Sequence, residues 1–188
     1  MNSINRFNTV EKHIREFFAD HPITEHQWTL GPVPEAMPEF RVLCAAPGNR
    51  TGCWTYLSVG ASCIEHEDSG LLEFFIISPV EDLRNVELVT MTAWYHKSKT
   101  LGWGHTFPIG ESWLGDSHCD HMLISTPYPF GPDLEICNFP NGHIHLLWLL
   151  PITEAERDYK LANDLESLEQ SFEDAGLEYW NVSRSSVV

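Results

Sequence analysis

Histidines and cysteines gather in the second half of the chain, where they could bind a metal ion or supply a nucleophile. Five of the ten histidines lie between positions 105 and 145, and a cysteine stands among them. Imidazole nitrogen and thiolate sulfur are ligands that zinc prefers. The candidate ligands are His105, Cys119, His121, His143 and His145. A hydrolase that uses this cluster, with or without zinc, is therefore one interpretation of the sequence.

The spacing of these residues favours a simpler interpretation. Structural zinc sites pair their ligands at short, recognisable intervals, and no such pair occurs in this stretch. Cys119 with His105 or His143 would make a nucleophile and its base, but no local motif supports either pair. Hydrogen-bonded histidines on strands and turns, together with a buried thiol, explain the same residues. We therefore predict no catalytic residue and no cofactor.

The stretch from Thr100 to Glu156 carries acidic and aromatic residues but no lysine or arginine. The two kinds of residue are interleaved along this stretch. Aromatic side chains anchor protein interfaces, and complementary charge accelerates association. The pattern therefore predicts a surface that receives a basic polypeptide. Core aromatic residues beneath a solvated acidic face would give the same pattern, and an aromatic-lined groove with an acidic rim would favour the binding interpretation.

Length and charge narrow the classes of protein. The chain has 188 residues, 43% of them hydrophobic, which suits one domain over residues 1–188. Lysine and arginine number 11 and aspartate and glutamate 27, so the formal charge is −16. Nucleic acids and anionic membranes attract cationic side chains, so we exclude both as partners. The first ten residues lack the apolar segment of a secretory signal, and no run approaches the roughly 18 apolar residues of a membrane span.

Cysteine usage agrees with a cytoplasmic protein. The five cysteines are odd in number and form no C-x-x-C pair. In a reducing compartment such residues are most simply buried free thiols. We therefore expect a cytoplasmic location and no disulfides.

The first part of the chain predicts one helix followed by short strands. Asn8 and Glu11 form a capping-box pattern, and the apolar stripe that follows ends before Pro22. Turn-forming residues separate the strands, which are expected at His26–Leu30, Glu39–Ala45, Cys53–Val59 and Leu72–Ser78. The last strand is almost continuously apolar, so it is expected inside the sheet, covered on both faces.

The second part predicts two more helices and a further group of strands. A wide apolar stripe that includes Leu83 marks a helix over Glu81–Thr100, with Gly102 as its stop. A capping box at Thr153–Glu156 begins a closing helix that runs to Gly176. The strands between these helices are expected at Thr106–Ile109, His121–Ser125, Leu134–Cys137 and His143–Leu150.

This order of elements predicts an α+β fold. The domain should contain a mixed, largely antiparallel β-sheet packed with three main α-helices. The long helix separates two groups of strands and could be a crossover, which allows one parallel pair.

Several segments in combination resemble the suppressor-of-fused domain. They are Tyr56–Ser62, Leu101–His105, Cys119–Ser125, Pro127–Gly131, Leu147–Glu156 and Arg184–Val188. The resemblance runs from about Trp54 to the C-terminus. It implies a non-catalytic protein related to the two-domain animal regulators of Hedgehog signalling, which clamp a peptide of a zinc-finger transcription factor, partly by strand pairing. The chain corresponds to the N-terminal domain alone and resembles the compact bacterial members, which are often inferred to be immunity proteins that neutralise a toxin.

The resemblance carries over to few individual residues. Tyr95 matches a tyrosine that the animal proteins use for peptide binding, whereas Gly104 stands where they have an aspartate. Taken with the acidic stretch, the resemblance predicts a basic polypeptide partner, such as a toxin, that docks on side chains or adds a strand to the sheet. A structural or self-associating module is the third interpretation, and we assign no oligomeric state. The candidate contact residues are Tyr95, Trp103, His105, Trp113, Asp120, Tyr128 and Phe130.

Overall fold

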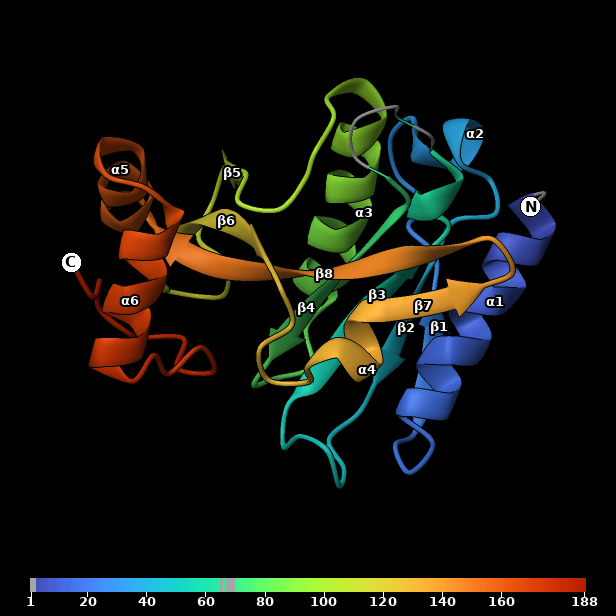
Figure 1. Ribbon diagram of the computed structural model, residues 1–188, viewed down its shortest axis with the longest axis horizontal. Coiled ribbons are helices and arrows are strands. Elements are labelled where there is room, and N and C mark those ends of the chain that lie inside the picture. The colour runs from blue at the N-terminus through green and yellow to red at the C-terminus, as the bar shows by residue number, and fades with distance from the viewer. Residues whose placement is uncertain (1–2, 65, 67–69) are drawn as a thin grey trace.

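One mixed β-sheet forms the centre of the domain (Figure 1). The computed structural model describes residues 3–64, 66 and 70–188. Within these residues the strands pair in the order β1-β2-β3-β4-β8-β6-β5, and β7 pairs separately with β8. The strands are β1 (Ile23–His26), β2 (Arg41–Ala45), β3 (Trp54–Val59), β4 (Leu72–Ser78), β5 (Thr106–Pro108), β6 (Cys119–Ser125), β7 (Ile136–Phe139) and β8 (Gly142–Thr153). Only the β4–β8 pair is parallel, which confirms the predicted mixed, largely antiparallel sheet.

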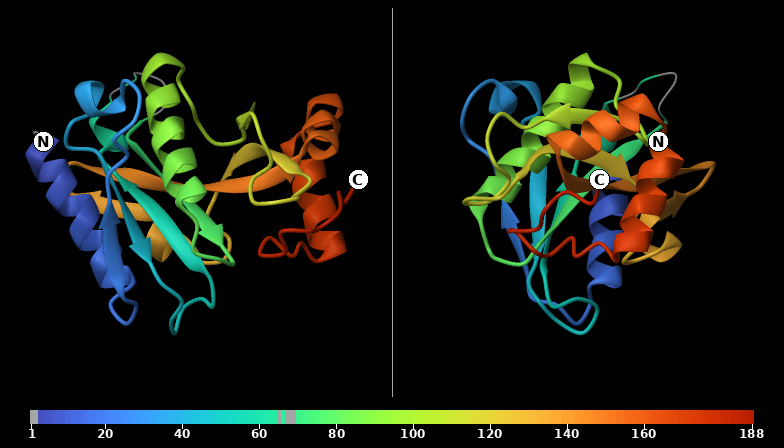
Figure 2. Two further views of the ribbon diagram at one scale, coloured as in Figure 1. Left: turned by 180° about the vertical axis from the view of Figure 1, so that it is seen from behind. Right: turned by 90° about the vertical axis from the view of Figure 1, so that its left-hand side faces the viewer.

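Helices cover both faces of this sheet. They are α1 (Ser3–Phe17), α2 (Val33–Ala36), η1 (Ala61–Cys63), α3 (Leu83–Ser98), α4 (Pro132–Glu135), α5 (Glu154–Ala162) and α6 (Leu165–Ala175). Side chains alternate between the faces of a strand. Phe75 and Ile77 of β4 therefore pack with α1, whereas Phe74 and Ile76 pack with α3. The two helices lie on opposite faces of the sheet (Figure 2), and the predicted α+β class is confirmed.

The parallel pair of strands holds the two halves of the chain together. β4 is buried at every position, as predicted for an inner strand. β8 is the longest strand, and it pairs with β4 and β7 through its first half and with β6 through its second half. A chain that leaves β4 and returns parallel to it needs a crossover, and α3 lies in that connection.

Two predicted boundaries near the N-terminus are wrong. α1 begins before Asn8 and Glu11, so these residues lie inside the helix and form no capping box. Glu11 instead pairs with Arg41 of β2. The first strand covers Ile23–His26 rather than His26–Leu30, because only this segment finds pairing partners on β2.

Boundaries around α3 and β7 also differ from the prediction. The long helix is confirmed as α3, but Leu83 is exposed at its first turn instead of lying on the buried stripe. The helix ends when Lys99 adopts an extended backbone, before Gly102 is reached. The strand expected at Leu134–Cys137 shifts toward the C-terminus, because Leu134 lies in the short helix α4.

The closing helix begins as predicted but is divided in two. Thr153 and Glu156 form the predicted capping box at the start of α5. The helix stops at Asn163, and the side chain of Asp164 caps α6 by accepting a hydrogen bond from the backbone N–H of Ser167, at 2.8 Å. Gly176 ends α6 in the left-handed conformation, as predicted. The described chain therefore has four longer helices rather than three.

Two further sequence expectations concern cysteines and membrane spans. Cys44, Cys119 and Cys137 are buried free thiols and Cys53 is a half-buried one, and Cys63 is half-buried. Among the described residues, no helix has both the length and the apolar character that crossing a bilayer requires.

Glu73 is a fully buried carboxylate of β4 that fixes the turn after β3. It accepts hydrogen bonds from the backbone N–H groups of Gly60, Ala61 and Ser62, at 2.9, 3.2 and 3.1 Å. The hydroxyls of Ser58 and Ser62 also donate to it. Burial raises the pKa of Glu73, and these donors oppose the rise. The acceptor positions of this carboxylate are therefore occupied by the protein itself.

Glu156 is a second fully buried carboxylate, and it anchors the C-terminal tail. Arg184 donates to its two oxygens from two nitrogens, at 2.6 and 2.8 Å. The backbone N–H groups of Thr153 and Val187 donate to the same carboxylate, at 2.8 and 3.2 Å. Arg184 also donates to the carbonyl of Pro151, at 2.9 Å. This bidentate pair ties the tail to the end of β8 and the start of α5.

Candidate binding grooves

The histidines of the predicted cluster have separate partners. The Nδ1 atom of His121 lies 2.8 Å from a carboxylate oxygen of Asp120. The Nδ1 atom of His145 lies 3.2 Å from a carboxylate oxygen of Glu135, and its ring packs edge-to-face on that of His143 with centroids 4.7 Å apart. These contacts are those of hydrogen-bonded strand histidines, the simpler of the two interpretations.

The remaining members of the cluster do not complete a metal site or a nucleophile. His105 is exposed in the loop before β5, and Cys119 is buried in β6. Burial raises the pKa of the Cys119 thiol, which opposes the thiolate that a nucleophile requires. Within the described residues, no three His, Cys, Asp or Glu side chains are placed to share a metal ion. The predicted cluster therefore does not converge there.

Two of the predicted contact residues pack in or against the hydrophobic core. Trp113 is 1% exposed, and its indole N–H donates to the side-chain oxygen of Asn85 at 2.9 Å. Phe130 is half-buried, and its ring packs edge-to-face on Phe17 and Phe18 with centroids 5.6 and 5.5 Å away. Both aromatic residues therefore serve the hydrophobic core in this fold, the alternative that the sequence also allowed.

Three predicted aromatic residues lie at the surface, but they belong to different regions. Tyr95, Trp103 and Tyr128 are 42%, 57% and 64% exposed. Tyr95 stands on α3, Trp103 in the loop that follows it, and Tyr128 in the loop after β6. Asp120 is partly exposed on β6, next to the edge strand. Of these residues, Tyr95 lines one of the two grooves described below and Tyr128 lines the other, whereas Trp103 and Asp120 are not in the lining of either groove.

The first groove lies between α3 and β5, and we call it the α3–β5 groove. It encloses about 320 Å³. Tyr95 and Phe107 form one end, with ring centroids 6.0 Å apart. Arg84 closes the other end by donating to the carbonyl of Ile109 at 2.9 Å. Its lining residues are Arg84, Glu87, Leu88, Met91, Thr92, Tyr95, Phe107, Pro108 and Ile109.

The edge strand beside this groove offers few backbone partners. His105 and Ile109 direct their backbone hydrogen bonds toward the β6 side. Bonding directions alternate along a strand, so Thr106 and Pro108 turn their backbone groups toward the open side. Proline has no N–H, which leaves a single donor on this edge and limits strand addition there.

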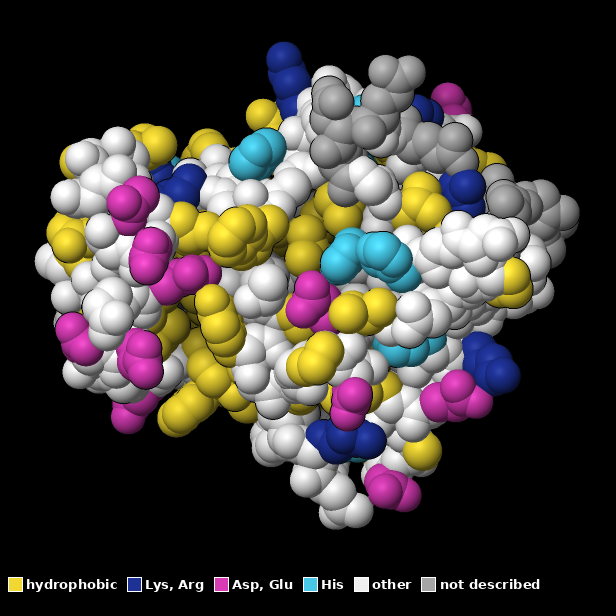
Figure 3. Space-filling view, viewed as in Figure 1, with side chains coloured by type: hydrophobic (Ala, Val, Ile, Leu, Met, Phe, Trp, Pro, Cys, Tyr) yellow, Lys and Arg dark blue, Asp and Glu magenta, His cyan; other side chains and the backbone are white. Residues whose placement is uncertain are grey.

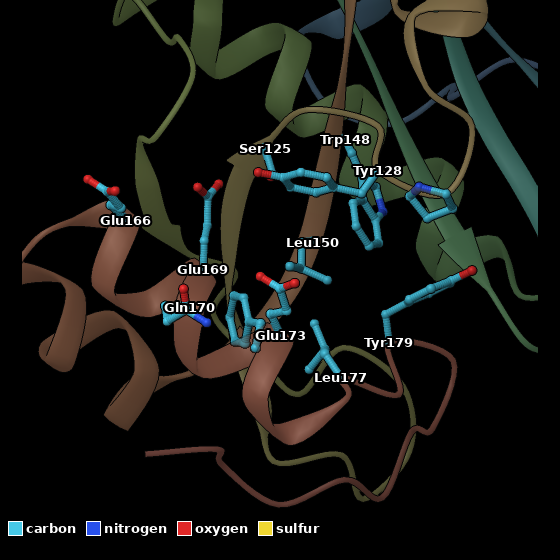
Figure 4. Close-up of a pocket in the computed structure, with 12 residues that line it drawn as sticks. Ser125, Tyr128, Trp148, Leu150, Glu166, Glu169, Gln170, Glu173, Leu177 and Tyr179 are labelled. Carbon is cyan, nitrogen blue, oxygen red and sulfur yellow. The ribbon is translucent and has the colours of Figure 1, made fainter.

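The second groove lies between α6 and the ends of β6 and β8, and we call it the α6 groove. It encloses about 700 Å³. Figure 4 shows Trp148 and Leu150 of β8 at its floor, Tyr128 and Tyr179 at its sides, and the glutamates of α6 along its rim. Its lining residues are Ser125, Tyr128, Pro129, Trp148, Leu150, Glu166, Glu169, Gln170, Phe172, Glu173, Leu177 and Tyr179.

Helical spacing places the acidic rim. Glu166, Glu169 and Glu173 follow one another at intervals of three and four residues, so they share one face of α6. Phe172 turns inward and packs in the core, which orients that face toward the groove. Figure 3 shows Asp and Glu side chains gathered over α6, beside a hollow lined by hydrophobic side chains.

The α6 groove is acidic, and two of its polar side chains are partly buried. Its described lining includes three glutamates and no lysine, arginine or histidine. Burial raises the pKa of Glu169, while the hydroxyl of Tyr128 acts in the opposite direction. Burial also raises the pKa of Tyr128. An aromatic-lined groove with an acidic rim, the feature that would favour the binding interpretation, is therefore present.

The sequence prediction missed most of this groove. Tyr128 was the only predicted contact residue that lines it. The acidic stretch defined from the sequence, Thr100–Glu156, ends there because Arg157 and Lys160 follow. A second stretch without lysine or arginine extends from Leu161 to Ser183 and contains the α6 glutamates, so a signal for the rim was available in the sequence.

Comparisons with known proteins agree on one family. The profile described as Suppressor of fused protein (SUFU) matches residues 37–185. A solved suppressor of fused homologue from Neisseria gonorrhoeae is similar to this chain with a TM-score of 0.86 and 35% identity over 98% of both chains. No curated protein matches the chain.

Two more distant solved structures share the fold. A chain of a Sufu–Fu complex is similar with a TM-score of 0.69 and 13% identity, over 97% of this chain and 92% of that one. Drosophila Suppressor of Fused is similar with a TM-score of 0.65 and 12% identity. The match covers 97% of this chain but 51% of the Drosophila protein, so the chain spans about half of that protein's length.

Proposed function

Because this chain belongs to the suppressor of fused family, we propose that it is a non-enzymatic cytoplasmic module that binds a basic polypeptide. Proteins of this family are regulators rather than catalysts, and one solved relative of this fold is a Sufu–Fu complex. Family membership therefore supports a protein-interaction role. The chemistry of the partner has to be argued from this chain's own surface.

The α6 groove is the observation that carries the proposal. It combines aromatic side chains, which anchor interfaces, with three carboxylates that no cation of the described lining neutralises. The net charge of −16 extends the negative potential beyond the groove. Such a potential raises the association rate of a cationic partner by about 10–10³-fold. A basic polypeptide satisfies both features.

An immunity protein is the biological role that we favour for such a module. A toxin that acts on nucleic acid needs a basic surface to hold its substrate. An acidic domain that covers this surface would block the toxin and be steered to it by the same charges. We propose that contacts come from the α6 groove and from the surface residues Tyr95, Trp103, His105, Asp120 and Tyr128, with docking by side chains more important than strand addition.

Co-expression with the products of neighbouring genes tests this function. We expect one of them to be a basic polypeptide that purifies with this domain as a complex of defined stoichiometry in size-exclusion chromatography with light scattering. If the partner is a toxin, co-expression should also restore growth. Failure of every neighbouring product to form a complex would contradict the proposal.

Charge-matched variants test the surface. Replacing Glu166, Glu169 and Glu173 together by glutamine should slow association and weaken the complex. The control variant replaces Glu16, Glu35 and Glu81 by glutamine, which removes the same charge from exposed positions outside the groove. Only the first set should weaken the complex strongly at high salt, where long-range steering is screened. Equal effects of the two sets would show that the groove is not the contact surface.

A further inference from the structure

Trp148 brings an unpaired hydrogen-bond donor to the floor of the α6 groove. The side chain is 3% exposed, and its indole N–H has no hydrogen-bond partner among the described residues. Its ring packs edge-to-face on Tyr179, with centroids 5.1 Å apart, and Figure 4 shows the indole directed into the groove. Buried donors in folded proteins are almost always satisfied by protein groups or water, so this donor inside a groove can take an acceptor from a ligand.

Glu169 brings an unpaired acceptor to the rim of the same groove. Its Oε1 atom is buried and accepts no hydrogen bond from the described chain. Figure 4 shows its carboxylate beside the hydroxyl of Tyr128, with Glu166 and Glu173 nearby on α6. The groove thus presents a donor at its floor, carboxylates at its rim and aromatic rings between them. A complementary ligand carries an acceptor, a cation with several donors, and a flat surface.

We propose that the α6 groove binds an arginine side chain of the partner polypeptide, with its guanidinium on Glu169 and Tyr128 and a main-chain carbonyl of the same segment on the indole N–H of Trp148. This assignment rests on the proposed polypeptide-binding function. Guanidinium is planar, stacks on aromatic rings and donates two parallel hydrogen bonds to a carboxylate. The peptide group next to the arginine supplies the acceptor that Trp148 lacks.

Other ligands fit this groove less well. An anionic group would meet three carboxylates and no cation among the described lining residues. A lysine ammonium would satisfy the charge, but it is a compact point charge that does not use the flat aromatic walls. A purely apolar segment would leave both the Trp148 donor and the Glu169 acceptor without partners.

A peptide titration followed by NMR tests the assignment. The probe is acetyl-Gly-Gly-Arg-Gly-Gly-amide at up to millimolar concentration, with the citrulline peptide as a neutral analogue of the same shape and the lysine peptide as a charged one. The readout is the indole N–H signal of Trp148 in the ¹⁵N-labelled protein. We expect this signal to move downfield on addition of the arginine peptide, because its N–H gains an acceptor.

Affinity should depend on both charge and shape. We expect binding of the arginine peptide to be about tenfold tighter than that of the citrulline peptide, as for one charge-assisted hydrogen bond. Glu169→Gln should weaken binding of the arginine peptide by a similar factor, and Glu166→Gln tests the rim if that variant folds poorly. Glu16→Gln, on α1, removes an equal charge outside the groove and should leave the affinity unchanged within about twofold.

Several results would overturn the arginine assignment. An unmoved Trp148 signal, equal affinity for the citrulline peptide, or equal affinity for the lysine peptide would each do so. These outcomes are separate from failure of the proposed function. A polypeptide partner that forms a complex without perturbing the Trp148 signal would support the proposed function and contradict the arginine site. Binding of the arginine peptide by a domain for which no polypeptide partner is found would support the arginine site and contradict the proposed function.

Discussion

The buried carboxylates of Glu73 and Glu156 contrast with the carboxylates along the α6 groove. Glu73 accepts five hydrogen bonds and Glu156 four, all from the protein itself. In the α6 groove, Glu169 keeps an oxygen that accepts no hydrogen bond from the described chain. A carboxylate whose acceptor positions are filled internally stabilises the fold, whereas one with an unused acceptor position is available to a ligand.

The same contrast appears among the segments that resemble the suppressor-of-fused domain. Tyr56–Ser62 contains all the donors to Glu73, whereas Leu147–Glu156 and Arg184–Val188 contain Glu156 and its partners. Those segments therefore identify the scaffold. Some resembling segments also reach the α6 groove. Pro127–Gly131 contributes Tyr128 and Pro129, and Leu147–Glu156 contributes Trp148 and Leu150 to its floor. None of the α6 glutamates lies in a resembling segment.

The largest effect that we expect comes from breaking the Glu156–Arg184 pair. Arg184→Ala leaves a buried carboxylate without its cation and frees the C-terminal tail, so the free energy of unfolding should fall by about 3–5 kcal/mol. Urea denaturation measures the change. Arg15→Ala removes one of the two arginine partners of the more exposed Glu11 and should cost about 0.5 kcal/mol or less. A loss below about 1 kcal/mol for Arg184→Ala would show that this pair is not a structural anchor.

A somewhat smaller loss is expected at Glu73. Glu73→Gln places an amide N–H₂ among donors that need an acceptor, so at least one buried N–H or hydroxyl loses its partner. The free energy of unfolding should fall by about 1–3 kcal/mol in urea denaturation. Glu25→Gln, at an exposed position of β1, is the matched control and should be nearly neutral. A neutral Glu73→Gln variant would contradict the role assigned to this carboxylate.

The smallest change in the free energy of unfolding is expected for a substitution in the α6 groove, and it should be a gain rather than a loss. Glu169→Gln should leave the free energy of unfolding unchanged or raise it by about 0.5 kcal/mol at neutral pH. The folded-state pKa of Glu169 is raised by burial, so its ionised form opposes folding. That opposition is fully present above the raised pKa and disappears as the pH falls below the unfolded value of about 4.3.

Denaturation at two pH values checks this sign. Any gain in the free energy of unfolding of Glu169→Gln over the wild-type domain should be present at about pH 7, well above the carboxyl range, and should vanish at about pH 3.5. A clear loss of stability at neutral pH would place Glu169 with Glu73 and Glu156, and the contrast between scaffold and groove would fail.

Much of the fold could be predicted because its strands are strongly patterned. Leu72–Ser78 was predicted with its full bounds, and the capping box at Thr153 was predicted from four residues. Errors arose where tertiary contacts decide local structure. The division between α5 and α6 at Asn163 is an example, since the apolar period continues across it and only the cap at Asp164 marks the new start.

The binding site was harder to predict than the fold, because aromatic type does not reveal exposure. Trp113 and Tyr128 both lie in the stretch without lysine or arginine, yet Trp113 is 1% exposed and Tyr128 is 64% exposed. The sheet register decides which of them faces solvent. Trp148 combines both properties, since it belongs to the core and also presents its N–H to a groove, and no sequence pattern distinguishes such a residue.

The position of β8 in the sheet has a consequence for how the protein is made. β4 is apolar along most of its length, and one of its two edges is completed only by β8, some seventy residues later in the chain. On the ribosome, the first four strands emerge with that edge open until β8 has been synthesised. An exposed apolar edge of this kind invites pairing with other nascent chains. Chaperone protection during translation would matter most for this interval.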